Sequence, residues 1–432
     1  MKYLIKDTAL VVYYYKDNIY SINALIGALE TDSYFDNINV YFITNKNELI
    51  EGLKDIITKH KLIIVGISFF TTQLWDIYNI ISSLRNKYKK KVLYIAGGSH
   101  PTGDPLGVLK LGFDFVIVGE GEETLRELLK KVDVGSDFEA VKGIAFINDF
   151  DEYISTGRRK AINLDEYHPF PLKNRRFGAI EITRGCPYVC YFCQTPYILG
   201  TKPRHRSIET ICRYVKILKN YYGDLTDVRF ITPNAFSYGS LDGKVLNLTK
   251  LEKLLKNIRE IIGKKGRIFL GTFPSEVRPE HVTNDTLGLV LRYADNDNIT
   301  IGAQSGSQRI LDLCHREHSV QDIYNAVDLT LRSNLKINVD FIFGLPGEND
   351  EDIKLTIQMM KDLAIKGVKL HAHSFIPLPQ TPFAKVPVNK VEDIYKKEIK
   401  SLISKGFAFG DWQKQEKLAI KIAKYMKSMK LT

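Results

Sequence analysis

The chain has 432 residues, of which 44% are hydrophobic and 26% are charged, and its formal net charge is +11. This composition is that of an ordinary folded globule. No stretch reaches the ~18 uncharged apolar residues that a membrane helix requires, and the start lacks the pattern of a signal peptide. We therefore expect a cytoplasmic protein without a membrane partner. The lysines are spread along the chain, which favours solvated helix faces over a nucleic-acid partner.

Residues 1–135 alternate short β-branched runs with amphipathic helical stretches. The runs are TALVVYYY, INVYFIT, LIIVGISFF, KVLYIAGG and FDFVIVGE. This alternation predicts a doubly wound, Rossmann-like parallel sheet, whose ligand crevice lies at the carboxyl ends of its strands. Three of these ends carry glycine together with hydroxyl or acidic side chains. The candidate ligand contacts there are Ser68, Thr71, Gly97, Gly98, Ser99, His100, Gly119, Glu120, Gly121 and Glu122.

Residues 136–175 have the composition of a linker, with a hairpin predicted at KGIAFINDFDEYISTG. From 176 to 385 strands and helices alternate again. The predicted strands are AIEITRG, VRFITPN, RIFLGTF, NITIGAQSG, KINVDFIFG and KLHAHSFIPL. They predict a partial (β/α)6 barrel with its active site on the carboxyl rim. Residues 386–432 are rich in lysine and predict a short helical C-terminal extension.

Three cysteines, Cys186, Cys190 and Cys193, follow the first predicted barrel strand. Three thiolates can hold three irons of a 4Fe-4S cluster and leave the fourth iron open to a ligand. A structural zinc loop and three inert, buried cysteines are the alternatives. Zinc normally needs a fourth protein ligand, and the next histidine, His205, is not at a short ligand spacing. Cys212 and Cys314 lie in helical patterns, where packing explains them.

The spacing C-x3-C-x2-C, with the aromatic Phe192 before the last cysteine, resembles the signature of the radical S-adenosylmethionine (SAM) superfamily. The resemblance covers residues 176–385. It implies that the open iron binds the amino and carboxylate groups of SAM. It also implies that an electron from an external donor cleaves SAM to a 5′-deoxyadenosyl radical, and that the backbone around Phe192 contacts the adenine.

The other barrel strand ends supply further candidate cofactor contacts. These are Pro233, Asn234, Glu276, Arg278, Gln304, Ser305 and Asp340. Arg278 and Glu276 suit the methionine carboxylate and ammonium, respectively, because charge-assisted bonds hold such a zwitterion best. A rim salt bridge is the alternative for each of them. His371 and His373 would share one face of the sixth strand, where hydrogen bonding is favoured over metal ligation.

The glycine-rich strand ends GISFFT, GGSHPT and GEGEET resemble the cobalamin-binding domain that precedes the barrel in one large branch of this superfamily. Glycines would let the backbone approach the macrocycle and its tail, and hydroxyl groups would bond to the tail. The loop YYYKDNIYS contains no D-x-H-x-x-G motif, so we expect cobalamin without histidine as its lower ligand. For His100 we expect a structural or tail-contacting role.

This resemblance implies a class B type, cobalamin-dependent radical SAM methyltransferase. One SAM would methylate cobalamin, and a second would generate the radical that lets an unactivated carbon capture the methyl group. A methylthiotransferase acting on tRNA or a ribosomal protein is an alternative, because QSGSQRIL and FIFGLPGE resemble its barrel motifs. That family needs three further cysteines in its N-terminal domain, and residues 1–185 contain none. The polar strand ends of a full barrel argue against a third alternative, a non-enzymatic cobalamin or iron–sulfur sensor.

The composition suits a thermophilic methanogen. Relatives in such organisms methylate residues near the active site of methyl-coenzyme M reductase. The resemblance therefore suggests a peptide or protein substrate that is modified after translation, and we name a glutamine carbon of that enzyme as the candidate.

Overall fold

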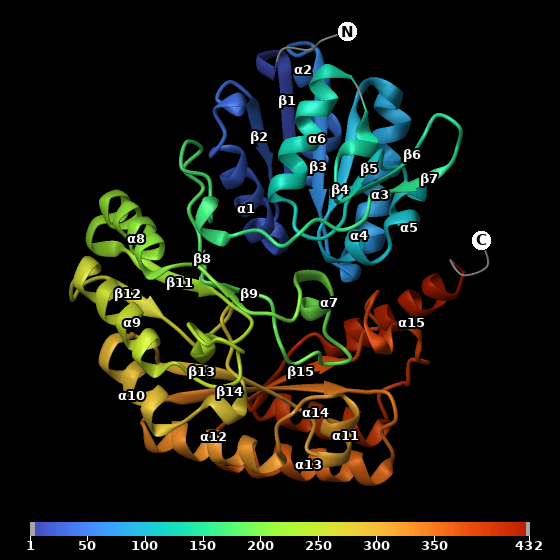
Figure 1. Ribbon diagram of the computed structural model, residues 1–432. Helices are drawn as coiled ribbons and strands as arrows, with labels where there is room; N and C mark the ends of the chain where they lie inside the picture. The colour runs from blue at the N-terminus through green and yellow to red at the C-terminus, as the bar shows by residue number, and fades with distance from the viewer. Residues whose placement is uncertain (1–4, 136, 429–432) are drawn as a thin grey trace. The chain divides into compact units, whose positions relative to one another are not determined.

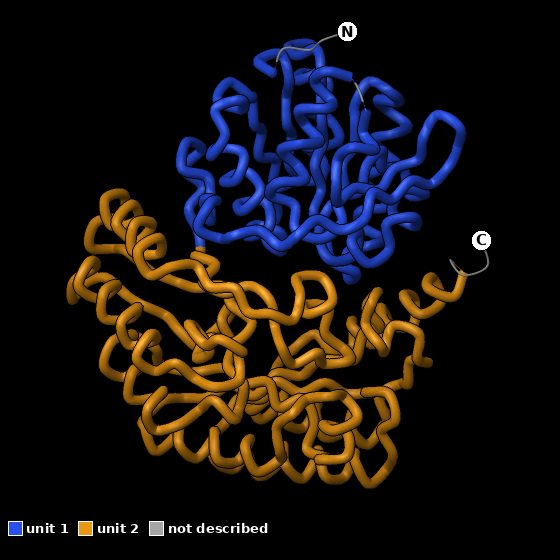
Figure 2. The backbone as a smooth tube through the Cα atoms, viewed as in Figure 1, with its two compact units in different colours: residues 1–178 blue, residues 179–432 orange. Residues whose placement is uncertain are grey.

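The computed structural model describes residues 5–135 and 137–428. The chain divides into two compact units, residues 1–178 and 179–432, each with its own core (Figure 2). The predicted limits at residues 1, 136 and 432 lie outside the described residues. Among the described residues, no helix combines the length and apolar character that a membrane span requires.

The first unit is built on one sheet of strand order β2-β1-β3-β4-β5-β6-β7 (Figure 1). Its first five strands are parallel, which confirms the predicted doubly wound fold. They are β1 Thr8–Tyr13, β2 Asn39–Ile43, β3 Leu62–Ser68, β4 Leu93–Gly97 and β5 Phe115–Ile117. The strand order reverses between β1 and β3, so the ligand crevice of such a sheet is expected at their carboxyl ends.

Helices follow each of these parallel strands. They are α1 Ile19–Leu29, α2 Lys46–Ile57, α3 Leu74–Tyr88, α4 Ser99–Gly103, α5 Pro105–Lys110 and α6 Glu122–Val134. An apolar core joins α1 and α6 to one face of the sheet, with Ile22 and Ile26 on α1 and Leu128 on α6 all buried. Burial of this face, at about 25 cal/mol per Å² of apolar surface, is the main stabilising contribution.

The hairpin predicted within residues 136–175 is present, and it adds two strands to this sheet instead of standing in a linker. They are β6 Ile144–Ile147 and β7 Tyr153–Ser155, and both pairings are antiparallel. Ile144 lies beside Ile117 of β5 and is fully buried. The hairpin thus covers an edge of the parallel sheet that would otherwise leave backbone groups unpaired. It extends the first unit to residue 178.

The second unit is a partial barrel of parallel strands, as predicted. Its parallel strands are β8 Ile180–Glu181, β11 Asp227–Ile231, β12 Arg267–Phe269, β13 Asn298–Gln304, β14 Lys336–Phe343 and β15 Lys369–Ser374, and β9 Thr183–Arg184, which continues the first of them, pairs antiparallel with a short strand, β10 Arg204–His205. The helices between them are α8 Ile208–Tyr222, α9 Leu248–Ile262, α10 Asn284–Tyr293, α12 Val320–Arg332 and α13 Asp350–Ile365. Two shorter helices are α7 Thr195–Leu199 and α11 Gln308–Leu313.

The sheet pairing is interrupted between β12 and β13. The parallel strands form two groups, β12-β11-β8 and β13-β14-β15-β16, in which β16 is Ala408–Phe409. Across the interruption, Thr300 donates its backbone N–H to the carbonyl of Gly271 at 2.8 Å, and Val277 donates to Thr300 at 2.9 Å. These bonds continue the curvature of the barrel through a loop, so the segment around Glu276 lies against the sheet.

The C-terminal extension consists of α14 Asp393–Ser404, β16 Ala408–Phe409 and α15 Trp412–Ser428. The helices agree with the prediction. The short strand β16 pairs in parallel with β15 and adds a strand to the barrel sheet. Trp412, at the start of α15, is buried at 2% exposure, and α15 packs along β15. The extension is therefore part of the second core.

Candidate cluster and cofactor sites

The three cysteines lie together in the loop between β9 and α7, at the carboxyl end of the first barrel strand. Cys190 is buried, and Cys186 and Cys193 are partly buried. Burial, together with the charges of the other two thiolates, raises the pKa of Cys186 to about 11. Three thiolates this close together need positive charge, which iron ions supply. The loop therefore fits an iron–sulfur cluster.

Gly185 makes the turn that leads into this loop. Its φ of 91° lies in the left-handed region, and a Cβ at this position would be 2.5 Å from the backbone oxygen of Lys202. The next residue, Cys186, donates its backbone N–H to the carbonyl of Gly200 at 3.0 Å. Only glycine allows the chain to pass this closely, so the position of the first cysteine depends on Gly185.

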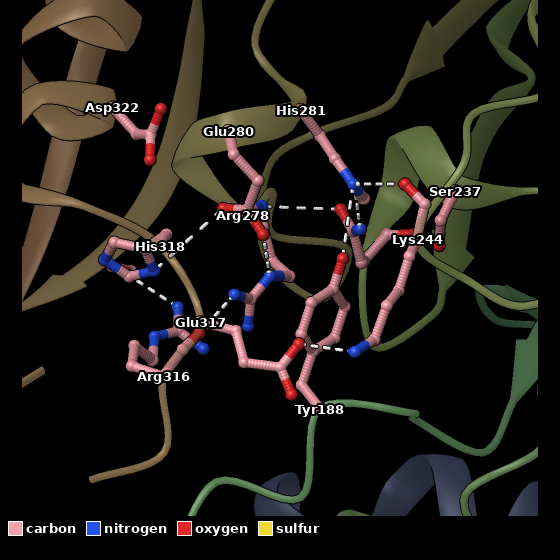
Figure 3. A network of polar contacts seen from close by, with 12 residues as sticks. Tyr188, Ser237, Lys244, Arg278, Glu280, His281, Arg316, Glu317, His318 and Asp322 are labelled. Atoms are coloured by element: carbon pink, nitrogen blue, oxygen red, sulfur yellow. Dashed lines mark hydrogen bonds and ion pairs between the residues drawn. The ribbon is translucent and has the colours of Figure 1, made fainter. Parts of the chain in front are cut away.

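A buried network anchors the cluster loop (Figure 3). The guanidinium carbon of Arg278 lies 3.3 Å from the ring centroid of Tyr188, which is in the loop between the first two cysteines. Arg278 also forms an ion pair with Glu280 and donates to the backbone carbonyl of Arg316. Only 4% of Arg278 is exposed. The structure therefore gives Arg278 an internal role in holding the loop, in place of the predicted contact with the methionine carboxylate.

A second arginine, which the sequence analysis did not single out, lies directly beside the cysteines. Arg316 donates from Nη1 to the Sγ of Cys190 at 3.6 Å and from Nη2 to the carbonyl of Gly302 at 2.7 Å. Its Nε is buried and has no hydrogen-bond partner among the described residues. An unpaired, buried guanidinium N–H beside the cluster loop suits a ligand carboxylate. The segment CHREHS lies outside the predicted strand ends, so nothing in its spacing marks Arg316.

Glu276, Asp340 and His371 lie close together near Arg316. Burial and the negative charge of Asp340 together raise the pKa of Glu276 to about 7, against the opposing charge of Arg316. Asp340 on β14 is paired in register with His371 on β15, and its Oδ1 lies 3.2 Å from Nδ1 of His371. The structure thus brings together two of the predicted cofactor contacts, Glu276 and Asp340.

Gln304 ends β13 in an unusual conformation. Its φ is 73°, and the register of β13 shifts between Gly302 and Gln304. A Cβ on Gly302 would lie 2.4 Å from Nε2 of Gln304 and 2.9 Å from Nη2 of Arg316. The Gln304 side chain therefore lies over Gly302, beside Arg316. A positive φ at a non-glycine residue costs free energy, and such conformations cluster at ligand sites.

Other predicted contacts are occupied within the protein. Ser305 is fully buried, and its Oγ lies 3.2 Å from the hydroxyl of Thr356. Asn234, next to Pro233, has its Nδ2 2.5 Å from Nδ1 of His281 and accepts from the backbone N–H of Arg278. These contacts support the loops that carry the site. Phe192 is partly buried against an apolar cluster that includes Phe375 and Phe383.

In the first unit, a small apolar cavity lies between the sheet and helices α1 and α6. Its lining residues are Leu10, Val12, Ile22, Leu25, Ile26, Gly66, Ile67, Ser68, Ile95, Gly97, Ile117 and Leu125. Ser68 and Gly97 place it at the carboxyl ends of β3 and β4. The Ser68 hydroxyl lies 2.9 Å from that of Ser21 on α1. This small apolar space, with a hydroxyl and a glycine at the strand ends, marks the edge of the sheet where the nucleotide tail of cobalamin would bind.

The glycines and the histidine around this cavity are closely packed. Gly98 has φ 100°, and a Cβ there would lie 2.8 Å from the backbone oxygen of Phe69. Burial lowers the pKa of His100 to about 4, and its Nδ1 lies 3.1 Å from the hydroxyl of Thr71. These contacts agree with a structural role for His100. Ser99, between Gly98 and His100, opens the short helix α4.

The third strand-end segment, residues 119–122, also makes close contacts with other parts of the first unit. Gly119 donates its backbone N–H to Oγ1 of Thr102 at 3.0 Å. Glu120 accepts from the backbone N–H of Ile162 at 3.1 Å, and a Cβ on Gly121 would lie 2.7 Å from Leu25. Glu122 is buried in the first turn of α6, where the helix dipole favours a carboxylate.

Comparison with protein-family models finds two matches. Residues 19–129 match the B12 binding domain, and residues 180–360 match the radical SAM superfamily. The two matches lie in different structural units. The first contains the glycine-lined cavity and the second contains the three cysteines.

The individual relatives and the solved structure carry the names of two kinds of enzyme, methyltransferases and a methylthio-adenosine synthase. An uncharacterized methyltransferase of Pyrococcus horikoshii is 26% identical, covering 74% of this chain and 70% of that protein. A tRNA-2-methylthio-N(6)-dimethylallyladenosine synthase of Buchnera aphidicola is 30% identical, but covers 51% of this chain and 48% of the synthase. The solved structure of the radical SAM methyltransferase TsrM from Kitasatospora setae, with cobalamin and a [4Fe-4S] cluster bound, has a TM-score of 0.66 at 16% identity, covering 88% of this chain and 77% of TsrM. At that identity the likeness shows a shared fold.

Proposed function

Because the chain belongs to the family in which a B12-binding domain precedes a radical SAM domain, we propose that it methylates an unactivated carbon of a peptide or protein. Its cofactors are a 4Fe-4S cluster, SAM and cobalamin. The observation that carries the proposal is the presence, in one chain, of a three-cysteine loop and a glycine-lined cavity at the strand ends of a second sheet. An external electron donor is part of the proposal.

The second unit provides residues for each polar group of SAM. When bound, the cluster supplies the electron that cleaves SAM, and cobalamin carries the methyl group. Arg316 would hold the methionine carboxylate through its unpaired Nε. Glu276 would accept from the ammonium group, because it is buried near Arg316 and is the carboxylate predicted for this role. The backbone around Phe192 would contact the adenine. Gln304 and Asp340 would contact the ribose.

In the first unit, Ser68, Gly97 and Gly98 would hold the nucleotide tail of cobalamin. The end of β1 and the loop after it carry Tyr13, Tyr14 and Tyr15 and no histidine, so we propose that cobalt has no histidine below it. The absorption and electron paramagnetic resonance spectra of the cobalamin-loaded protein test this point. A signature of nitrogen coordination by histidine would contradict it.

We propose a peptide or protein as the methyl acceptor, with a glutamine of methyl-coenzyme M reductase as the specific candidate. The experiment compares tryptic peptides from a strain with the gene and a strain without it, both grown on methionine labelled in its methyl group. We expect one peptide to lose a labelled methyl group when the gene is absent. Complementation with Cys190→Ala should not restore the label, whereas Cys212→Ala, which changes a cysteine outside the cluster loop, should restore it.

The sequence similarity to the Buchnera synthase makes methylthiolation of tRNA the second candidate. The lack of any cysteine before Cys186 argues against it, because sulfur insertion in that family requires a second cluster. Mass spectrometry of nucleosides from the two strains separates the candidates. A methylthio nucleoside that disappears with the gene would replace the proposal. Failure of the reconstituted protein to cleave SAM with dithionite would instead favour a sensor.

A further inference from the structure

The C-terminal extension reaches the polar side chains beside the SAM site. Phe409 of β16 stacks on the ring of His371, with centroids 4.5 Å apart and an interplanar angle of 11°. Gln415 of α15 contacts β15 twice, through the backbone of Ser374 and the ring of His373. These contacts join residues 408–415 to the strand that carries His371 and His373.

The first contact fixes the orientation of the Gln415 amide. Its Oε1 accepts from the backbone N–H of Ser374 at 2.8 Å, so Nε2 is the atom that faces His373, 3.3 Å from Nδ1. An amide nitrogen can only donate. Nδ1 of His373 must therefore accept, and since burial lowers the pKa of His373, its ring is neutral and carries its hydrogen on Nε2.

The direction of hydrogen-bond donation, from Gln415 to His373, continues from His373 to His371. Nε2 of His373 lies 3.1 Å from Nδ1 of His371, so Nδ1 of His371 is an acceptor as well. Oδ1 of Asp340 lies 3.2 Å from that nitrogen. With the hydrogen of His371 on its other nitrogen, His371 does not satisfy the carboxylate. Asp340, which is only 7% exposed, is left as an acceptor that needs a donor.

SAM has three kinds of hydrogen-bond donor: the ammonium group, the adenine amine and the ribose hydroxyls. The proposed function assigns the ammonium to Glu276 and the adenine to the backbone around Phe192. We propose that Gln415, His373 and His371 form a hydrogen-bond relay that keeps Asp340 available as the acceptor for the ribose hydroxyls. The inference rests on the proposed function. It makes Gln415 and the two histidines positioning residues and the C-terminal extension part of the SAM site.

The same three side chains could also be read as a metal site. The ligand atoms of Asp340, His371 and His373 all lie within 4.8 Å of one another. A metal on Nε2 of His373 would place the hydrogen of that ring on Nδ1, facing the N–H group of Gln415. Metal-bound histidines normally donate this second N–H to an acceptor. The orientation of Gln415 therefore favours the relay.

Gln415→Glu tests the direction of the relay. Glutamate would still accept from Ser374, but its second oxygen would accept from Nδ1–H of His373, which reverses each bond up to His371. His371 would then carry its hydrogen on Nδ1, shared between Nε2 of His373 and Oδ1 of Asp340, and would so compete with the ribose for Asp340. We expect the dissociation constant of SAM, measured by equilibrium dialysis with the cluster-loaded protein, to rise about tenfold. Gln413→Glu, at an exposed position on the same helix, is the matched control and should leave it unchanged.

The tautomers provide a readout that does not depend on SAM. In protein labelled with ¹⁵N-histidine, His371 and His373 should carry their hydrogens on Nε2, and in Gln415→Glu they should carry them on Nδ1. Difference spectra with His371→Gln and His373→Gln assign the signals. Unchanged tautomers, or unchanged SAM binding in Gln415→Glu, would overturn the relay while leaving the proposed function intact. Metal that copurifies with the protein and is lost in His371→Gln would also overturn it. A wild-type protein that binds no SAM would overturn both.

Discussion

Replacement of Arg278 by methionine is the sharpest test of how the cluster loop is held. The substitution keeps a long apolar side chain but removes the charge that contacts Glu280, the Tyr188 ring and the backbone of Arg316. In the ion pair, the side chain of Arg278 is 5% exposed and that of Glu280 is 20% exposed. Removal of one partner of a buried pair costs about 3–5 kcal/mol, because it leaves the other charge uncompensated.

We therefore expect Arg278→Met to lower the free energy of unfolding of the second unit by about 3–5 kcal/mol. The protein has two tryptophans, Trp75 in the first unit and Trp412 in the second. A Trp75→Phe background therefore lets tryptophan fluorescence report the second unit alone. Urea unfolding of the metal-free protein gives the stability, and iron content after anaerobic reconstitution reports the cluster. We expect less bound iron, because Tyr188 lies between two of the cluster ligands.

Two further variants separate the mechanism from a general loss of stability. Arg292→Met removes an exposed ion pair with Glu252 and should cost about 1 kcal/mol or less. Adding Glu280→Gln to Arg278→Met removes the uncompensated carboxylate and should recover part of the loss. The reasoning would be refuted if Arg278→Met unfolded at the same urea concentration as Arg292→Met and kept its full iron content.

Three other predictions follow from single residues. Gly98→Ala should destabilise the first unit by about 1–3 kcal/mol and reduce cobalamin retained on dialysis, because its φ is 100° and its Cβ would lie 2.8 Å from a backbone oxygen. Gly52→Ala, in a helix where the added Cβ would meet only the side chain of Glu48 at 3.9 Å, is the control and should retain cobalamin. Arg316→Lys should weaken SAM binding about tenfold at unchanged iron content, because lysine cannot reproduce the guanidinium contacts; unchanged binding would remove Arg316 from the site. Burial raises the pKa of Glu348 to about 7, so the folded state holds a proton that the unfolded state has lost above its ordinary pKa of 4.5. Stability should therefore fall by about 3 kcal/mol as the pH rises from 4.5 to 7, and Glu348→Gln should remove this fall in pH-dependent urea titrations; parallel pH profiles of the two proteins would contradict it.

The sequence by itself determined the features that depend on neighbouring residues. Cys186, Cys190 and Cys193 are close together in any folded form of their loop, so their spacing alone indicated an iron–sulfur site. The parallel strands were predictable because their β-branched runs are short, buried and separated by amphipathic helices. Residues at strand ends could be chosen as ligand candidates for the same reason, since parallel strands bring their carboxyl ends to one edge.

The tertiary structure decided which of these candidates can act. Arg278 and Arg316 are equivalent as charges in the sequence. In the structure, Arg278 packs against Tyr188 and pairs with Glu280, whereas Nε of Arg316 has no hydrogen-bond partner among the described residues. The contact of Gln415 with His373 joins residues far apart in the chain, and no local pattern encodes it. Hydrogen-bond direction and burial belong to the folded environment of a side chain, so the role of Asp340 as an acceptor could be inferred only from the structure.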